Sequence, residues 1–307
     1  MPVEECIFCG VNLVDLPDQQ AAEKSRDHPV PKWLQAEMSI KKDMVHQGEV
    51  GREGTLTPGR KHVVAGFMTG GVCKKNCNGG WMSTMETRVM PFLLDLISEK
   101  RRLEDLSSAE ENALALWAVK TAYSFNHGSS ASFRVPLEHL RQLATDPASI
   151  PDGVGVFACI HPGTHRKAFD FVQAQGWVGT DDRAKNPGSY KLCLRFGHLL
   201  LLTAYWPSEE DCLMYERSTH RPLAVKHTTL SVDLGLKFSE LKVLDGIGMA
   251  TFVQSLGVLP GSPISIGARI CDSRFLEAYK KGVDTLVQRS AMPFFRVTRR
   301  ADLPGSS

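Results

Sequence analysis

The sequence lacks the long apolar run that a membrane-spanning helix needs. Its most apolar stretch, residues 197–206 (GHLLLLTAYW), has about half the length required to cross a bilayer. The first residues, MPVEECIFCG, contain neither the basic segment nor the apolar segment of a secretory signal. We therefore expect a cytoplasmic protein with no membrane partner. In that reducing compartment the 8 cysteines are better explained as thiols or metal ligands than as disulfides.

The chain also lacks a strong excess of charge and a complete phosphate-binding motif. Its formal net charge is +2 and 23% of its residues are charged, so its overall field would not by itself gather nucleic acid. Basic residues outnumber acidic ones in residues 20–102, although an ordinary solvated surface also produces such a local excess. Gly48, Gly51 and Gly54 are not followed by Gly-Lys-Ser/Thr, which excludes a standard P-loop.

Length and patterning predict an α+β protein of about two domains, because 307 residues with 42% hydrophobic content can fill one large core or two ordinary ones. We expect an N-terminal domain in residues 1–102, which holds the cysteine and histidine motifs, and a helical connector in residues 103–150. Residues 151–307 are expected to form a mixed α+β domain with a mainly antiparallel sheet, whose role is target recognition or regulation.

Local patterns predict the individual elements. Residues 24–34 should be extended, because the residue before each of Pro29 and Pro31 is pushed out of the helical region. Residues 35–61 are rich in Gly and Pro and are expected to form a loop, and a strand is expected over residues 62–68. Ser107 and Glu110 form a capping box. Helical spacing of apolar residues predicts helices over residues 81–102, 107–123, 136–144, 238–259 and 273–287.

Four of the cysteines form two close pairs, Cys6 with Cys9 in CIFCG and Cys73 with Cys77 in CKKNC. Each spacing lets a short turn present two thiolates to one metal ion, and four thiolates suit tetrahedral Zn²⁺. We predict a structural Zn²⁺ site here, the alternative being four isolated core thiols. The remaining cysteines stand alone among apolar residues and are interpreted as buried thiols: Cys159, Cys193, Cys212 and Cys271.

Polar residues with a second kind of chemistry accompany both pairs. Asp27 and His28 precede Pro29 between the two pairs, and Asn78 directly follows Cys77. A leading C-x2-C, an Asp-His followed by an apolar-Pro turn, and a second cysteine pair followed by Asn together resemble the zinc-supported HNH endonuclease domain, a ββα-metal fold. The resemblance covers roughly residues 4–90, under a third of the chain. It implies that His28 is the general base and that Asp27 and Asn78 bind one catalytic Mg²⁺ or Mn²⁺.

These residue types also suit the chemistry on physical grounds. Phosphodiester hydrolysis needs a deprotonated water, and a neutral imidazole with a pKa near ambient pH is able to take that proton. It also needs positive charge on the scissile phosphate, which a Mg²⁺ held by a carboxylate and a carboxamide supplies. We expect Arg26, Lys74 and Lys75 to contact the phosphates of a nucleic acid, with DNA the expected partner. Solvent-facing positions for these three residues are an equally good interpretation.

The sequence departs from the HNH pattern in one place. Met68 and Thr69 stand where the family has a middle Asn, which orients the loop carrying the general base. The Thr69 hydroxyl could supply that hydrogen bond instead, and His46 and His62 are other candidate histidines. An alternative function is therefore a non-catalytic zinc-ribbon module that binds nucleic acid or protein. Cutting both DNA strands with one site per chain would require a homodimer.

Overall fold

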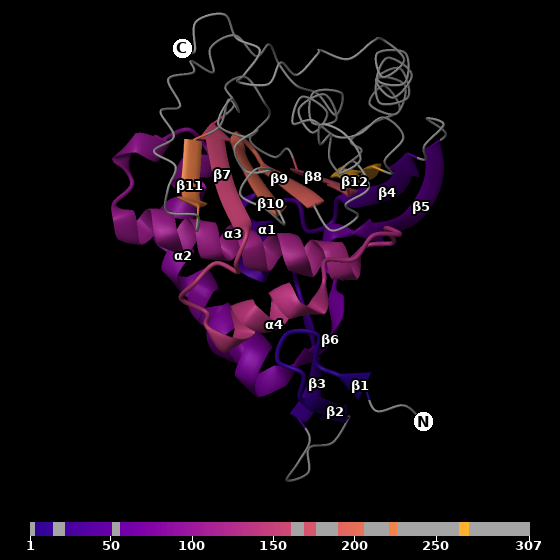
Figure 1. Cartoon of the computed structure of the whole chain (residues 1–307). Helices are drawn as coiled ribbons and strands as arrows, with labels where there is room; N and C mark the ends of the chain where they lie inside the picture. The colour runs from indigo at the N-terminus through magenta and orange to yellow at the C-terminus, as the bar shows by residue number, and fades with distance from the viewer. Residues whose placement is uncertain are drawn as a thin grey trace, which may run out of the picture.

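The computed structural model in Figure 1 describes residues 4–14, 22–50, 56–160, 169–175, 190–205, 221–225 and 264–269. The described part is a mixed α+β structure, as predicted, in which a small sheet and a large sheet lie on opposite sides of a central helix. The helices expected over residues 238–259 and 273–287 lie outside the described residues, as do Cys212 and Cys271. Among the described helices, none is long and apolar enough to cross a membrane.

The small sheet carries both cysteine pairs. It has the strand order β1-β2-β3-β6. The bounds of its strands are β1 (Glu4–Glu5), β2 (Asn12–Val14), β3 (Ala22–Asp27) and β6 (Thr69–Cys73). β3 and β6 pair antiparallel, and the chain continues from β6 into the irregular helical turn η2 (Lys74–Met82) and helix α2 (Ser83–Ile97). Residues 28–68 lie between β3 and β6 in the chain, and β3, β6 and α2 are together called the ββα unit below.

The segment between β3 and β6 corrects three predictions. The stretch predicted to be extended over residues 24–34 runs into helix α1 (Lys32–Glu37). The loop predicted over residues 35–61 contains the second half of α1, all of strand β4 (Met44–Val50) and most of strand β5 (Leu56–Val63), and β4 and β5 form a hairpin. The strand expected over residues 62–68 is also wrong, because β5 ends at Val63 and a 3₁₀ turn, η1 (Val64–Gly66), follows. The register of β4 against β5 shifts between His46 and Gly48, and the two strands pair on both sides of this irregularity. A third strand, β12 (Ile264–Arg269), pairs with β4 of this hairpin. Local sequence patterns do not reveal such a long-range contact.

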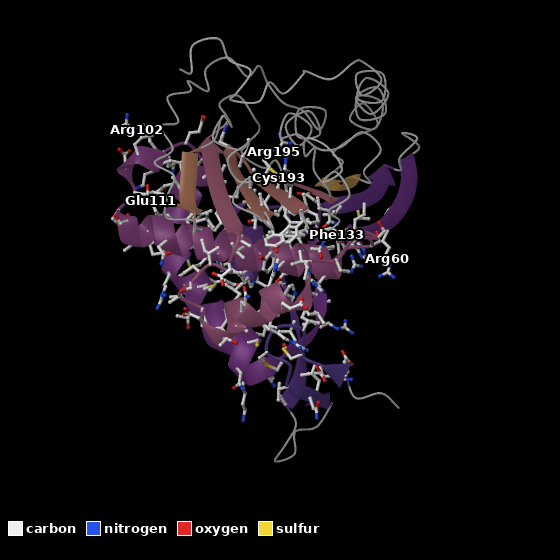
Figure 2. The ribbon with its side chains drawn as sticks, viewed as in Figure 1. Arg60, Arg102, Glu111, Phe133, Cys193 and Arg195 are labelled. Atoms are coloured by element: carbon white, nitrogen blue, oxygen red, sulfur yellow. The ribbon has the colours of Figure 1, made fainter. Side chains whose placement is uncertain are left out.

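The large sheet is antiparallel throughout its described strands and has the order β11-β7-β10-β9-β8-β12-β4-β5. Its other strands are β7 (Val154–Ile160), β8 (Phe169–Gln175), β9 (Tyr190–Phe196), β10 (Leu199–Tyr205) and β11 (Arg221–Val225). Cys193 and Arg195 lie on β9 (Figure 2), and the Cys193 thiol is buried as predicted. The pairing of β4 with β12 joins strands from both sides of the predicted domain boundary.

Helix α3 (Ser108–Gly128) is the centre of the core. Ser107 and Glu110 close the predicted capping box at its start. Residues 114–126 are all buried, because α3 runs between α2 and β6 on one side and the large sheet on the other (Figure 1). Phe125 stacks on Phe67, with ring centroids 5.0 Å apart, and Trp117 packs on Phe196 of β9. The short helices η3 (Leu103–Asp105) and α4 (Leu137–Thr145) complete the predicted helical segment.

Candidate metal centre and the charged cluster beside it

The first cysteine pair lies in a tight turn after β1. The Gly10 amide donates a hydrogen bond to the Cys6 carbonyl at 2.8 Å, and the Cys6 amide donates to the Val11 carbonyl at 2.8 Å. Gly10 has a φ of +74°, in the left-handed region that a side chain would disfavour. The turn therefore brings the Cys6 and Cys9 thiols onto one side of the small sheet.

The second pair lies where β6 passes into η2. Cys73 is the last residue of β6, and Cys77 lies in η2. The backbone approaches itself closely here, since a Cβ on Gly80 would lie 2.8 Å from the Lys75 carbonyl oxygen. Glycine at this position permits this close approach within η2, three residues after Cys77.

The four thiols meet, which confirms the predicted cluster. All four Sγ atoms lie within 4.8 Å of one another. The Sγ atoms of Cys6 and Cys77 are 3.8 Å apart, and those of Cys9 and Cys73 are 3.6 Å apart. A tetrahedron with Zn–S bonds of about 2.3 Å has sulfur–sulfur edges of about 3.8 Å. Two of the sulfur–sulfur distances therefore match a zinc tetrahedron, and none exceeds its edge by more than about 1 Å, so the donor set and its spacing suit a metal ion such as zinc.

Three of the four thiols, those of Cys6, Cys9 and Cys77, have shifted pKa values. The pKa of Cys6 is lowered to about 5, chiefly by its side-chain hydrogen bond with Cys77. The same hydrogen bond raises the pKa of Cys77, and burial raises the pKa of Cys9 to about 11. A dication at the centre would stabilise all four thiolates together, since coordinating thiols are deprotonated.

Asp27 ends β3 and points into the protein. The register of β3 against β6 shifts between Ser25 and Asp27, and such an irregularity re-aims the side chains that follow it. The Asp27 side chain is 2% exposed, and its Oδ1 accepts a hydrogen bond from the Lys120 ammonium at 3.0 Å. Within the described part of the chain, its Oδ2 has no hydrogen-bond partner. One oxygen of this buried carboxylate is therefore neutralised and the other remains unpaired.

His28 directly follows Asp27 and is half-buried. Burial is the main cause that lowers the pKa of His28, and the positive charges of Lys32 and Lys120 lower it further, against the opposing effect of Asp27. The imidazole is therefore neutral at neutral pH, which is the protonation state that a general base requires.

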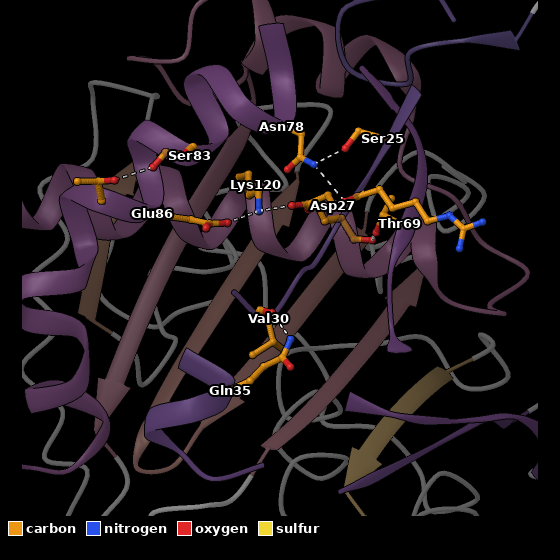
Figure 3. Close-up of polar contacts among 12 residues, drawn as sticks. Ser25, Asp27, Val30, Gln35, Thr69, Asn78, Ser83, Glu86 and Lys120 are labelled. Carbon is orange, nitrogen blue, oxygen red and sulfur yellow. Dashed lines mark hydrogen bonds and ion pairs between the residues drawn. The ribbon is translucent and has the colours of Figure 1, made fainter. Parts of the chain in front are cut away.

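Asn78 joins the helical turn η2 to strand β3 (Figure 3). Its Nδ2 group donates to the Ser25 hydroxyl at 2.6 Å and to the Arg26 carbonyl at 3.1 Å. Asn78 thus contacts the residue immediately before Asp27. Because both hydrogen bonds use the amide nitrogen, they leave the Asn78 side-chain oxygen for another partner.

The side chain of Thr69 has a different role from the one expected. Thr69 pairs with Asp27 across the two strands, but its hydroxyl donates to the Ser124 carbonyl of α3 at 2.6 Å. A Cβ on Gly128 would lie 2.8 Å from that hydroxyl, so α3 and β6 are in close contact here. Thr69 therefore ties β6 to α3, and its single hydroxyl proton is not donated to the loop that carries His28.

The other predicted site residues are at the surface or outside the site. Arg26, Lys74 and Lys75 are exposed, and the Lys74 ammonium forms an ion pair with Glu23 at 2.6 Å. His62 is half-buried and packs edge-on against the ring of Phe67. The side chain of His46 lies outside the described residues.

Two charged residues beside Asp27, Lys120 and Glu86, are not among the site residues that the sequence predicts. Lys120 of α3 is fully buried, and its ammonium lies 3.0 Å from both Asp27 Oδ1 and Glu86 Oε1. Burial alone would lower the pKa of Lys120, but attraction to the two carboxylates outweighs it and raises the pKa. Burial also raises the pKa of Glu86, which Lys120 opposes. A lone lysine inside the apolar run LALWAVKTAYSF was the available signal, because a buried lysine requires acidic partners.

Fold and site together define a mixed α+β protein with a four-cysteine site for a metal ion and a charged cluster buried at the end of the adjacent strand. No family model matches the chain, and neither a curated protein nor a solved structure gives a significant match.

Proposed function

We propose that this chain is a metal-dependent endonuclease of the HNH type that hydrolyses phosphodiester bonds in DNA. The observation that carries the proposal is the contact of Asn78 with the Arg26 carbonyl, which holds the residue after the second cysteine pair against the strand end that bears Asp27 and His28. The succession of β3, β6 and α2 around four clustered cysteines supports the same fold unit.

The local donors fit a hard divalent cation. Asp27 Oδ2 is a buried carboxylate oxygen without a hydrogen-bond partner among the described residues, and the Asn78 oxygen is left over by the hydrogen bonds of its amide nitrogen. Carboxylate and carboxamide oxygens are the ligands that Mg²⁺ and Mn²⁺ prefer. A cation bound there would supply positive charge to the scissile phosphate and the leaving oxygen.

The chain's own residues divide the remaining work. His28, neutral because it is half-buried among positive charges, takes the proton from the attacking water. Arg26, Lys74 and Lys75 lie exposed around the same strand and turn, where they position the phosphate backbone without reading sequence. In this proposal residues 151–307 recognise the target or regulate cleavage, and two copies of the chain cooperate if both strands are cut.

The decisive experiment compares two histidines. His28→Ala should abolish plasmid nicking in Mg²⁺ or Mn²⁺ while the zinc content and the melting temperature stay unchanged. His62→Ala is the matched control, because burial also lowers the pKa of His62 and it lies outside the site. Undiminished nicking by His28→Ala would refute the role of the general base.

A second function is favoured by a specific observation. Asp27 is 2% exposed and ion-paired with Lys120, so its carboxylate is in part neutralised without any metal ion. In a non-catalytic zinc module that binds nucleic acid or protein, Asp27 would have only the structural role of pairing with Lys120. Binding of DNA without cleavage in Mg²⁺, Mn²⁺, Co²⁺ or Ca²⁺ would favour this function over the nuclease.

A further inference from the structure

The Lys120 ammonium lies at a point that two carboxylates share (Figure 3). Its Nζ is 3.0 Å from Asp27 Oδ1 and 3.0 Å from Glu86 Oε1. Asp27 comes from β3 and Glu86 from α2, so the two acids belong to the first strand and the helix of the ββα unit, whereas Lys120 comes from α3. The lysine thus reaches into the ββα unit from outside it.

This point has the properties of a cation site. Divalent ions bind carboxylate oxygens at about 2.0–2.6 Å, so each oxygen would have to move by about 1 Å or less to reach an ion at the Nζ position. Lys120 is fully buried, and the Asp27 side chain is 2% exposed. Two carboxylates this close would repel each other in such surroundings unless a positive charge lay between them.

The arrangement also affects the free oxygen of Asp27. In metallonucleases with two ions, the ions lie about 3.5–4 Å apart and act on opposite oxygens of the reaction. Here the ammonium takes Oδ1, so Oδ2 is the oxygen of Asp27 that remains for an ion. The three side chains keep a net charge of one negative unit, which a single dication would more than balance.

We infer that Lys120 is an internal cation that occupies the position of a second metal ion and positions Asp27 so that the site takes a single divalent ion. The statement about the single ion rests on the proposed nuclease function. The statement that Lys120 fills a metal position does not, because it depends only on the two carboxylates around the ammonium.

The test counts Mn²⁺ ions. Mn²⁺ binding to the full zinc-loaded chain is measured by the electron paramagnetic resonance signal of free Mn²⁺. Because Mn²⁺ prefers oxygen ligands, it leaves the thiolate-bound zinc in place. Lys120→Ala should bind one more Mn²⁺ per chain than the unmodified chain. Adding Glu86→Gln to that variant should remove the extra ion. Arg102→Ala is the charge-matched control, since Arg102 is an exposed cation in an ion pair with Asp105 at 3.0 Å.

The outcomes separate the inference from the proposed function. If the unmodified chain binds no Mn²⁺ and Lys120→Ala binds one, the catalytic site fails but the role of Lys120 stands. If Lys120→Ala binds the same number of ions as the unmodified chain, the inference is overturned whatever the nuclease assay gives. A lysine that served only to hold α3 against the ββα unit would give this second result.

Folding provides an independent readout if Lys120→Ala is unstable. Without the ammonium, two acidic side chains at the core face each other, so the variant should depend on Mn²⁺ for its fold. Its melting temperature should rise with Mn²⁺ and not with potassium chloride of the same ionic strength. A variant that stays unfolded at every Mn²⁺ concentration would overturn the inference.

Discussion

Removing one thiol from the four-cysteine cluster should have a much larger effect than removing a thiol from the core. Cys77 and Cys193 are both fully buried, but Cys77 lies 3.8 Å from Cys6 in the cluster while Cys193 lies on β9. Cys77→Ala and Cys193→Ala delete the same atoms from equally buried positions. The difference between the two variants therefore measures what the cluster contributes beyond packing.

The expected size follows from the geometry. Because all four sulfur atoms already lie within 4.8 Å of one another, zinc binding needs only small shifts of these atoms, and structural zinc contributes about 10–16 kcal/mol in small zinc-folded peptides. This is comparable to the whole stability of a typical domain, about 5–15 kcal/mol. Losing one of four ligands should therefore cost at least about 5 kcal/mol, against about 1 kcal/mol for an ordinary core substitution.

The assay combines zinc content with thermal unfolding. The unmodified chain and Cys193→Ala should each carry one zinc per chain, and Cys77→Ala should carry much less. A loss of about 5 kcal/mol corresponds to a fall in melting temperature of roughly 10–20 °C for a chain of this size. Chelation with EDTA should bring the unmodified chain down by a similar amount. Equal zinc content and equal melting temperatures for Cys77→Ala and Cys193→Ala would refute the metal centre and leave four core thiols.

Three further predictions concern single positions. Asp27→Asn should destabilise the fold by about 3–5 kcal/mol in urea unfolding, because it removes a partner of the fully buried Lys120; Glu86→Gln should cost less, about 1.5–3 kcal/mol, since the Glu86 side chain is 23% exposed, and an equal or larger cost for Glu86→Gln would contradict the asymmetry. Burial lowers the pKa of His127 to about 4, so the unfolded chain takes up a proton near pH 6.5 that the folded chain refuses until about pH 4. Stability should therefore fall as the pH drops between these values, by up to about 3 kcal/mol, and His127→Gln should reduce this fall in a series of urea titrations; an unchanged pH profile would show that other groups cause it. Gly80→Ala should lower zinc retention during dialysis against a chelator, because its Cβ would lie 2.8 Å from a backbone carbonyl oxygen, and full retention would show that the turn can relax.

Local sequence is sufficient to predict the turn at the first cysteine pair and the start of the central helix α3. Two cysteines separated by two or three residues can be presented to one point by a single turn of chain, and Gly10 allows the first of these turns. Ser107 and Glu110 likewise fix the start of α3 through contacts within one turn of helix. Such features involve neighbouring residues, so their energetics can be inferred without knowing the rest of the fold.

The surroundings of Asp27 depend on contacts between segments that are far apart in the sequence. Lys120 lies 93 positions away along the chain, and it reaches Asp27 because α3 packs against β6 and α2. Thr69 turns its hydroxyl to α3 for the same reason. The hairpin of β4 and β5 depends in the same way on β12, which supplies a neighbouring strand from the far end of the chain. Hydrogen bonds and ion pairs between distant segments depend on how the elements pack, and local periodicity carries no information about that packing.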